Sequence, residues 1–123
     1  MKRRAGTGLV NNELRLLLTA ADLLSAGHKR FHGYDLARHL SDIDETSVMS
    51  QPTLYRSLRR LEERGALTSE WEDLGEAASS GREGRPRRYY RLTTAGAELA
   101  RRELGDRQLE WSQGRLIPLP SVD

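Results

Sequence analysis

The sequence predicts a mainly α-helical domain that carries one small β-hairpin. Apolar residues recur at helical spacing in several segments, and two short alternating segments flank a stretch rich in glycine and charge. The 123 residues have the length of one domain. No apolar run reaches the roughly 20 residues that a membrane span needs. The chain has no cysteine, which excludes disulfides and thiolate metal sites and fits a reducing, cytoplasmic location.

The first predicted helix begins at the cap residues 11–12 and ends at Gly27. Residues 1–8 before it are basic and glycine-containing, and we expect them to form a flexible arm. The helix is apolar on two faces, and the second face includes Leu16 and Leu23. Because a helix of this kind needs two partners, we expect one face in the core and the other against a second copy of the chain.

Two further helices are expected in the middle of the chain. The shorter one opens at Gly33 and is followed by a polar turn at residues 42–48. The next helix is capped by Ser50, carries Pro52 in its first turn and stops at Gly65. Its leucines recur at i, i+4 and i+7, so this row should face inward.

A β-hairpin and a last helix complete the predicted fold. The strands are expected at residues 66–72 and 87–92, around a flexible basic tip at 73–86 that buries no core. The last helix is expected to contribute to a dimer over residues 97–113, before an extended tail at 114–123. Its thin apolar stripe consists of Ala97, Ala100, Leu104 and Trp111.

Three helices followed by a hairpin are the layout of a winged helix-turn-helix, here over residues 9–96. The third helix of that layout enters the DNA major groove. Its exposed side chains suit this role, since glutamine can pair with adenine and arginine with guanine. The candidate DNA contacts on this helix are Ser50, Gln51, Thr53, Tyr55, Arg56, Arg59 and Arg60.

The hairpin tip adds positive charge. Arginine inserts well into a narrow minor groove and also contacts phosphates. The net charge is only +2, but basic and acidic residues cluster separately, so one face can bind a polyanion. The candidate contacts on the hairpin are Arg85, Arg87 and Arg88.

Three motifs in this order resemble the PadR family of bacterial repressors. They are His32-Gly33-Tyr34-Asp35-Leu36, Ser50-Gln51-Pro52-Thr53-Leu54-Tyr55 and Gly84-Arg85-Pro86-Arg87-Arg88-Tyr89-Tyr90-Arg91-Leu92-Thr93. The resemblance implies a homodimeric repressor that binds a double-stranded DNA operator at a nearby promoter. It also implies dimerisation through the N- and C-terminal helices. Many members respond to small aromatic ligands, and Trp111 matches a position where the family often places an aromatic residue.

Two other classes of function, an enzyme and a protein-binding module, differ in the residues that they need. An enzyme is disfavoured, because no nucleophile motif and no paired acids are evident. No acidic residue completes a recognisable ligand pattern with His28, His32 and His39, so neither a metal nor a cofactor is expected. The remaining alternative is a winged helix that binds another protein, although such modules often lose the basic helix and hairpin that this chain keeps.

Overall fold

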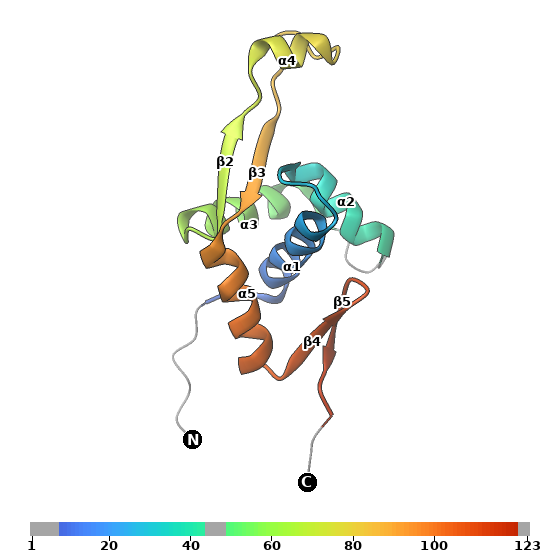
Figure 1. The fold of residues 1–123 in the computed structure, drawn as a ribbon, viewed down its shortest axis with the longest axis vertical. Helices are drawn as coiled ribbons and strands as arrows, with labels where there is room; N and C mark the ends of the chain where they lie inside the picture. The colour runs from blue at the N-terminus through green and yellow to red at the C-terminus, as the bar shows by residue number, and fades with distance from the viewer. Residues whose placement is uncertain (1–7, 44–48, 121–123) are drawn as a thin grey trace.

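The computed structural model describes the backbone of residues 8–43 and 49–120, and the side chains of these residues except 41–43. Most of the predicted basic arm, most of the predicted turn and residues 121–123 lie outside this part. The elements in chain order are α1 (Asn11–Ser25), β1 (Phe31–His32), α2 (Gly33–Ile43), α3 (Gln51–Glu63), β2 (Leu67–Trp71), α4 (Leu74–Ser79), β3 (Arg88–Leu92), α5 (Thr94–Asp106), β4 (Leu109–Ser112) and β5 (Arg115–Pro118). The predicted class, helical with a small hairpin, is confirmed (Figure 1).

The core forms around α1, which lies among the other helices (Figure 1). The leucine row of α3 faces inward as predicted, and Leu54, Leu58 and Leu61 are each at most 1% exposed. The cap of α1 differs from the prediction. Its N-cap is Val10, which has no side-chain acceptor, and the Glu13 carboxylate accepts the Val10 N–H at 3.0 Å.

The predicted hairpin stands away from the body as a wing, which comprises residues 67–92 (Figure 1). β3 lies between β1 and β2 in an antiparallel sheet, and the register pairs Leu67 with Leu92 and Trp71 with Arg88. The tip is not the structureless loop that we expected, since it contains α4. Asp73 caps this helix by accepting the Glu76 N–H at 2.9 Å, and Ala77 is completely buried.

The C-terminal segment contradicts the predicted helix over 97–113, whereas the tail that we expected to be extended includes the strand β5. α5 ends at Asp106, and β4 pairs with β5 as an antiparallel hairpin. Gln108, with φ 55°, takes the chain out of the helix, and the left-handed pair Gln113-Gly114 closes the hairpin with a two-residue turn. Trp111 therefore lies in a strand. The apolar–polar alternation of residues 109–111 is the pattern that the structure follows, and not the helical spacing of Trp111 from Leu104.

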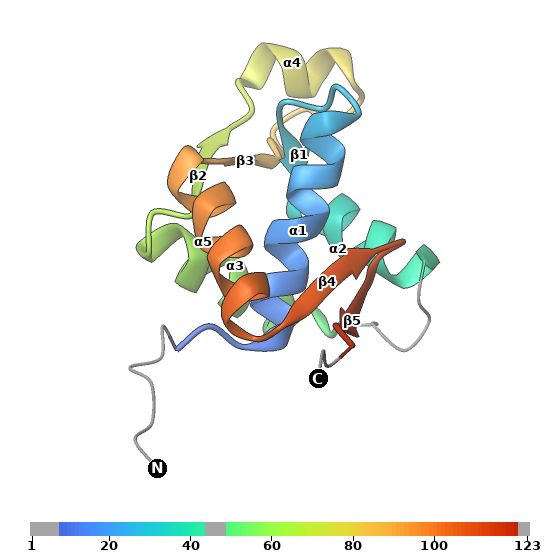
Figure 2. The same ribbon diagram turned by 60° about the horizontal axis from the view of Figure 1, so that its bottom comes forward.

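The hairpin of β4 and β5 folds back beside α1 (Figure 2), and the Trp111 indole N–H donates to Asp22 at 2.8 Å. Leu16 is completely buried within one chain and Ala100 is 2% exposed. The prediction that these two side chains contact a partner was wrong, because the chain's own elements already cover them. The other four predicted interface residues are partly exposed: Leu23, Ala97, Leu104 and Trp111. Among the described residues, no helix combines the length and hydropathy that crossing a bilayer requires.

Candidate nucleic-acid interface

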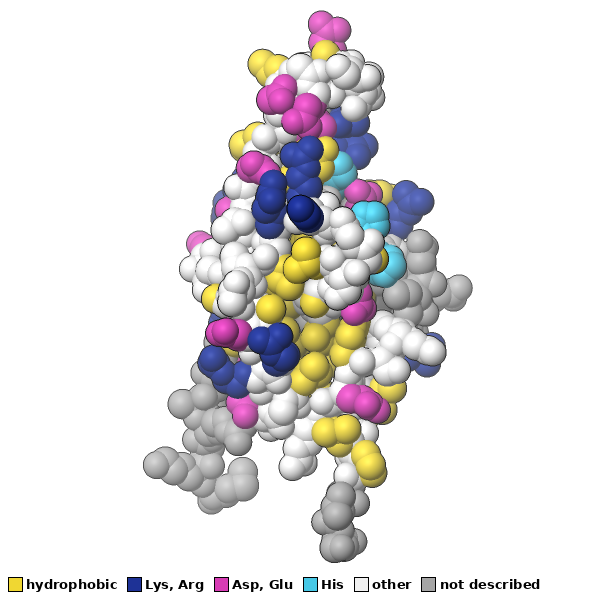
Figure 3. Space-filling view, in the orientation of Figure 1, with side chains coloured by type: hydrophobic (Ala, Val, Ile, Leu, Met, Phe, Trp, Pro, Cys, Tyr) yellow, Lys and Arg dark blue, Asp and Glu magenta, His cyan; other side chains and the backbone are white. Residues whose placement is uncertain are grey.

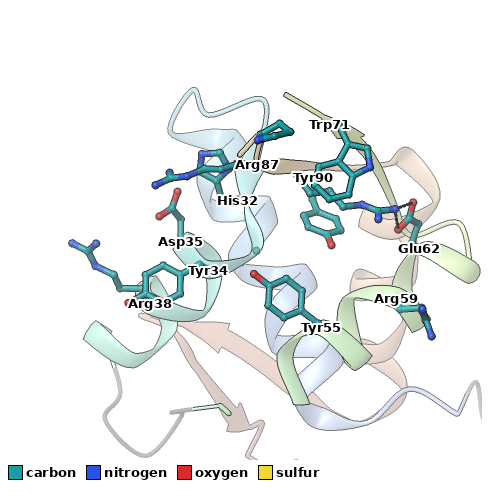
Figure 4. Close-up of a pocket in the computed structure, with 13 residues that line it drawn as sticks. His32, Tyr34, Asp35, Arg38, Tyr55, Arg59, Glu62, Trp71, Arg87 and Tyr90 are labelled. Atoms are coloured by element: carbon teal, nitrogen blue, oxygen red, sulfur yellow. Dashed lines mark hydrogen bonds and ion pairs between the residues drawn. The ribbon is translucent and has the colours of Figure 1, made fainter. Parts of the chain in front are cut away.

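A groove of about 760 Å³ opens between α2, α3 and the wing (Figure 4). Tyr34 and Tyr55 line it from the two helices, and Trp71 lines it from β2. Arg59 and Arg87 add guanidinium groups on opposite sides. Guanidinium groups on a concave surface suit a polyanion, because binding phosphates releases the counterions condensed on them.

The N-terminus of α3 is held by a reciprocal pair of hydroxyl groups. The Ser50 hydroxyl accepts the Thr53 N–H at 3.3 Å and donates to the Thr53 hydroxyl at 2.9 Å. The neighbouring Gln51 is exposed, and Tyr55 one turn later is 45% exposed. The first turn of α3 therefore presents polar side chains at the positive end of the helix dipole, which favours a phosphate.

The three arginines of α3 have different environments. Arg56 and Arg59 are exposed and form no ion pair with any described residue. In contrast, the Arg60 Nε atom lies 3.2 Å from the buried Glu13 carboxylate, and Arg60 also donates to the Gly8 carbonyl at 3.2 Å. Arg60 thus ties α3 to α1, whereas Arg56 and Arg59 remain available to a ligand.

The wing arginines divide in the same way. Arg88 Nη2 lies 3.2 Å from Glu62 in α3, and Arg88 Nε donates to the Ser69 hydroxyl at 2.9 Å. This arginine therefore connects the wing to α3 (dashed lines in Figure 4). Arg85 and Arg87 have exposed side chains that pair with no acid in the described part of the chain.

Glu72 organises the wing, and the sequence analysis did not identify it. Its side chain is 1% exposed and accepts hydrogen bonds from the Arg82 guanidinium, the Tyr89 hydroxyl at 3.1 Å and the Arg87 N–H at 3.3 Å. Burial alone would raise the pKa of Glu72, but these hydrogen bonds outweigh it and hold the pKa below its usual value. No local pattern marks this residue, because its partners reach it only across the hairpin.

His32 forms the end of the groove near α2. Burial lowers the pKa of His32, and the nearby Arg87 adds to this effect while Asp35 opposes it. The imidazole stacks on Tyr89 with ring centroids 4.3 Å apart. Among the residues that the structure describes, no three His, Cys, Asp or Glu side chains form a metal-binding group.

Comparison with known proteins relates this geometry to one family. Residues 23–102 match the model of the transcriptional regulator PadR-like family. A PadR family transcriptional regulator from Eggerthella lenta is 32% identical, with a TM-score of 0.52 over 76% of this chain and 73% of that one. A transcriptional regulator from Clostridium thermocellum shares the fold at 21% identity, with a TM-score of 0.59 over 76% of this chain and 79% of that one.

Another similar structure is Pex from Synechococcus, which is 27% identical, with a TM-score of 0.53 over 80% of this chain and 81% of that one. A search of curated proteins returned no match.

Proposed function

This chain belongs to the PadR-like family of transcriptional regulators, and we propose that it binds an operator sequence as a cytoplasmic homodimer and represses a nearby promoter. Members of the family are regulators and not enzymes, so the enzymatic alternative is set aside. DNA binding follows from the family, while the specific operator, the sign of regulation and the dimer are our proposals.

The proposal rests on the exposed arginines of α3 and of the wing, of which Arg59 and Arg87 line the groove. Arg56 and Arg59 on α3, and Arg85 and Arg87 on the wing, have no acidic partner among the described residues. An arginine on the reading helix can bind guanine with two hydrogen bonds, which discriminates by roughly 1–3 kcal/mol. Arginines on a wing contact phosphates and position the protein without reading sequence.

A homodimer would place two copies of α3 over two half-sites of the operator. Figure 3 shows a strip of hydrophobic side chains on the body below the wing, where α1 lies in Figure 1. We propose that Leu23, Ala97, Leu104 and Trp111 contribute to the dimer, because each keeps part of its surface exposed. Trp111 is also our candidate contact for a small aromatic effector, since its ring is only partly covered.

The test is fluorescence anisotropy of the protein with DNA from its own upstream region, compared with a scrambled duplex over a salt series. We expect tight, salt-dependent binding that prefers the native duplex. Arg56→Ala and Arg59→Ala should lower this preference by roughly tenfold. Arg85→Ala and Arg87→Ala should each weaken binding to both duplexes by the same factor. Each should also reduce the slope of the logarithm of the binding constant against the logarithm of the salt concentration by about one.

The matched control is Arg102→Ala, which removes one exposed arginine from α5, an element that is part of neither the reading helix nor the wing. It should leave the preference unchanged. An unaltered preference in Arg56→Ala and Arg59→Ala would show that α3 is not the reading helix. If the wild-type protein binds neither duplex at low salt, the alternative of a protein-binding winged helix is favoured.

A further inference from the structure

The connection between α1 and α2 reaches the tip of the wing through one arginine. Arg30 donates to the Glu76 carboxylate in α4 at 3.1 Å, and its Nη1 atom lies 3.9 Å from Glu70 in β2. The same guanidinium lies 3.9 Å from the centre of the Tyr89 ring in β3. The hydrogen bond with Glu76 raises the pKa of Arg30 above its usual value, although burial opposes this. The Arg30 guanidinium thus contacts all three elements of the wing, which are β2, α4 and β3.

Tyr89 extends this contact into the tip. Its ring contacts both the Arg30 guanidinium and the His32 imidazole, and its hydroxyl donates to Glu72 at 3.1 Å. Glu72 in turn accepts the Arg87 N–H, and the Glu72 N–H donates to the Arg87 carbonyl at 2.7 Å. A continuous set of contacts therefore runs from Arg30 to the backbone that carries Arg87.

Arg30 lies on the side of the wing that faces away from α3. Residues alternate along β2 and β3, and Trp71, Arg88 and Tyr90 line the groove. Arg30 contacts Glu70 and Tyr89, which occupy the opposite face. Arg30 lines a second hollow of about 410 Å³, which shares His32, Asp35 and Arg38 with the groove, and Arg30 is not itself among the residues that line the groove.

We propose that Arg30 is a positioning residue for DNA binding, which holds the wing so that Arg85 and Arg87 are presented to phosphates in an ordered conformation. This inference rests on the proposed function. A wing that is already ordered does not lose conformational entropy on binding, so affinity rises without any new contact to DNA. A direct phosphate contact would instead change the salt dependence.

The first experiment needs no DNA. Amide hydrogen exchange of the full chain is compared between the wild type, Arg30→Gln and the control Lys29→Gln, which removes the same charge from the adjacent exposed residue. We expect faster exchange at Glu72 and Arg87 in Arg30→Gln, with α1 and α3 unchanged. Lys29→Gln should match the wild type, and Arg30→Lys should recover most of the protection because it keeps the cation near Glu76.

The second experiment measures DNA binding of the same variants over a salt series. Arg30→Gln should bind about twofold to fivefold more weakly than the wild type, with the salt dependence of binding unchanged. Arg85→Ala should show the opposite pattern, with a slope lower by about one and normal exchange in the wing. Wild-type affinity in Arg30→Gln, or a salt slope reduced by about one as for a phosphate contact, would overturn the proposal.

Two outcomes need a further comparison. If Arg30→Gln lowers the stability of the whole domain, Glu76→Gln removes the same ion pair from α4 and should give the same exchange and binding pattern. Normal exchange and affinity in Glu76→Gln would then overturn the proposal. If the wild type does not bind DNA at low salt, the proposed function fails, while the exchange comparison still decides whether Arg30 holds the wing.

Discussion

Replacing Gly96 with alanine should destabilise the junction between α5 and the base of the wing. Gly96 lies in the first turn of α5, and its N–H donates to the cap residue Thr93 at 2.9 Å. A Cβ atom at this position would lie 2.1 Å from the Ala66 carbonyl oxygen and 2.9 Å from its carbon. These contacts are with backbone atoms, so no side-chain rotation can relieve them.

The size of the effect follows from this distance. To make room for the Cβ atom, the backbone at the start of β2 or in α5 must move by almost 1 Å. Overpacking of this kind lowers the free energy of unfolding by about 1–3 kcal/mol. The movement also strains the hydrogen bond from Thr93 N–H to the Ala66 carbonyl, which measures 3.1 Å and contributes roughly 1 kcal/mol. Alanine has a higher helix propensity than glycine, and this difference offsets up to about 1 kcal/mol of the loss. We therefore expect a net loss of about 2 kcal/mol in the free energy of unfolding.

The assay is thermal unfolding followed by circular dichroism, where this loss should lower the midpoint by about 10 °C for a domain of this size. The control is Gly105→Ala in the same helix, where an added Cβ meets nothing within 4 Å. That change should stabilise by up to about 1 kcal/mol. Equal midpoints for the two variants would refute the reasoning, since both replace a helical glycine and differ only in the space around it.

Two pH effects should also be measurable by thermal unfolding. Since the pKa of Glu72 is held below its usual value, its contribution to stability is present above about pH 4.5 and is lost as the pH falls through the lowered pKa. Glu72→Gln should therefore unfold at a lower temperature at pH 6 and differ less from the wild type at pH 3, and a constant difference would contradict this. Because burial lowers the pKa of His32, stability should fall as the pH drops below about 6.5. His32→Gln should reduce this loss between pH 6.5 and 5, and an unchanged pH dependence would show that His32 does not titrate as expected.

The positions of α3 and of the wing strands could be predicted because their signals are local. The Ser50 cap, the early proline and the leucine row all act within a few residues of one another. The strands of the wing likewise form where alternating residues were seen. The C-terminal segment was predicted wrongly because it carries two local signals, a helical stripe through Trp111 and the alternation of residues 109–111. Gln108 and the Gln113-Gly114 turn resolved the conflict in favour of a hairpin.

The sequence by itself placed Arg56 and Arg59 on α3 and Arg87 in the wing, and the structure shows that Arg59 and Arg87 line the groove. Only the tertiary structure decided which arginines are paired, because Glu13 lies far from Arg60 in the chain and Glu62 far from Arg88. The same holds for the burial of Leu16 and for the contacts of Glu72. Helical periodicity depends on neighbours a few residues apart, whereas the partner of a charge and the cover of an apolar face depend on residues that folding brings together from distant segments.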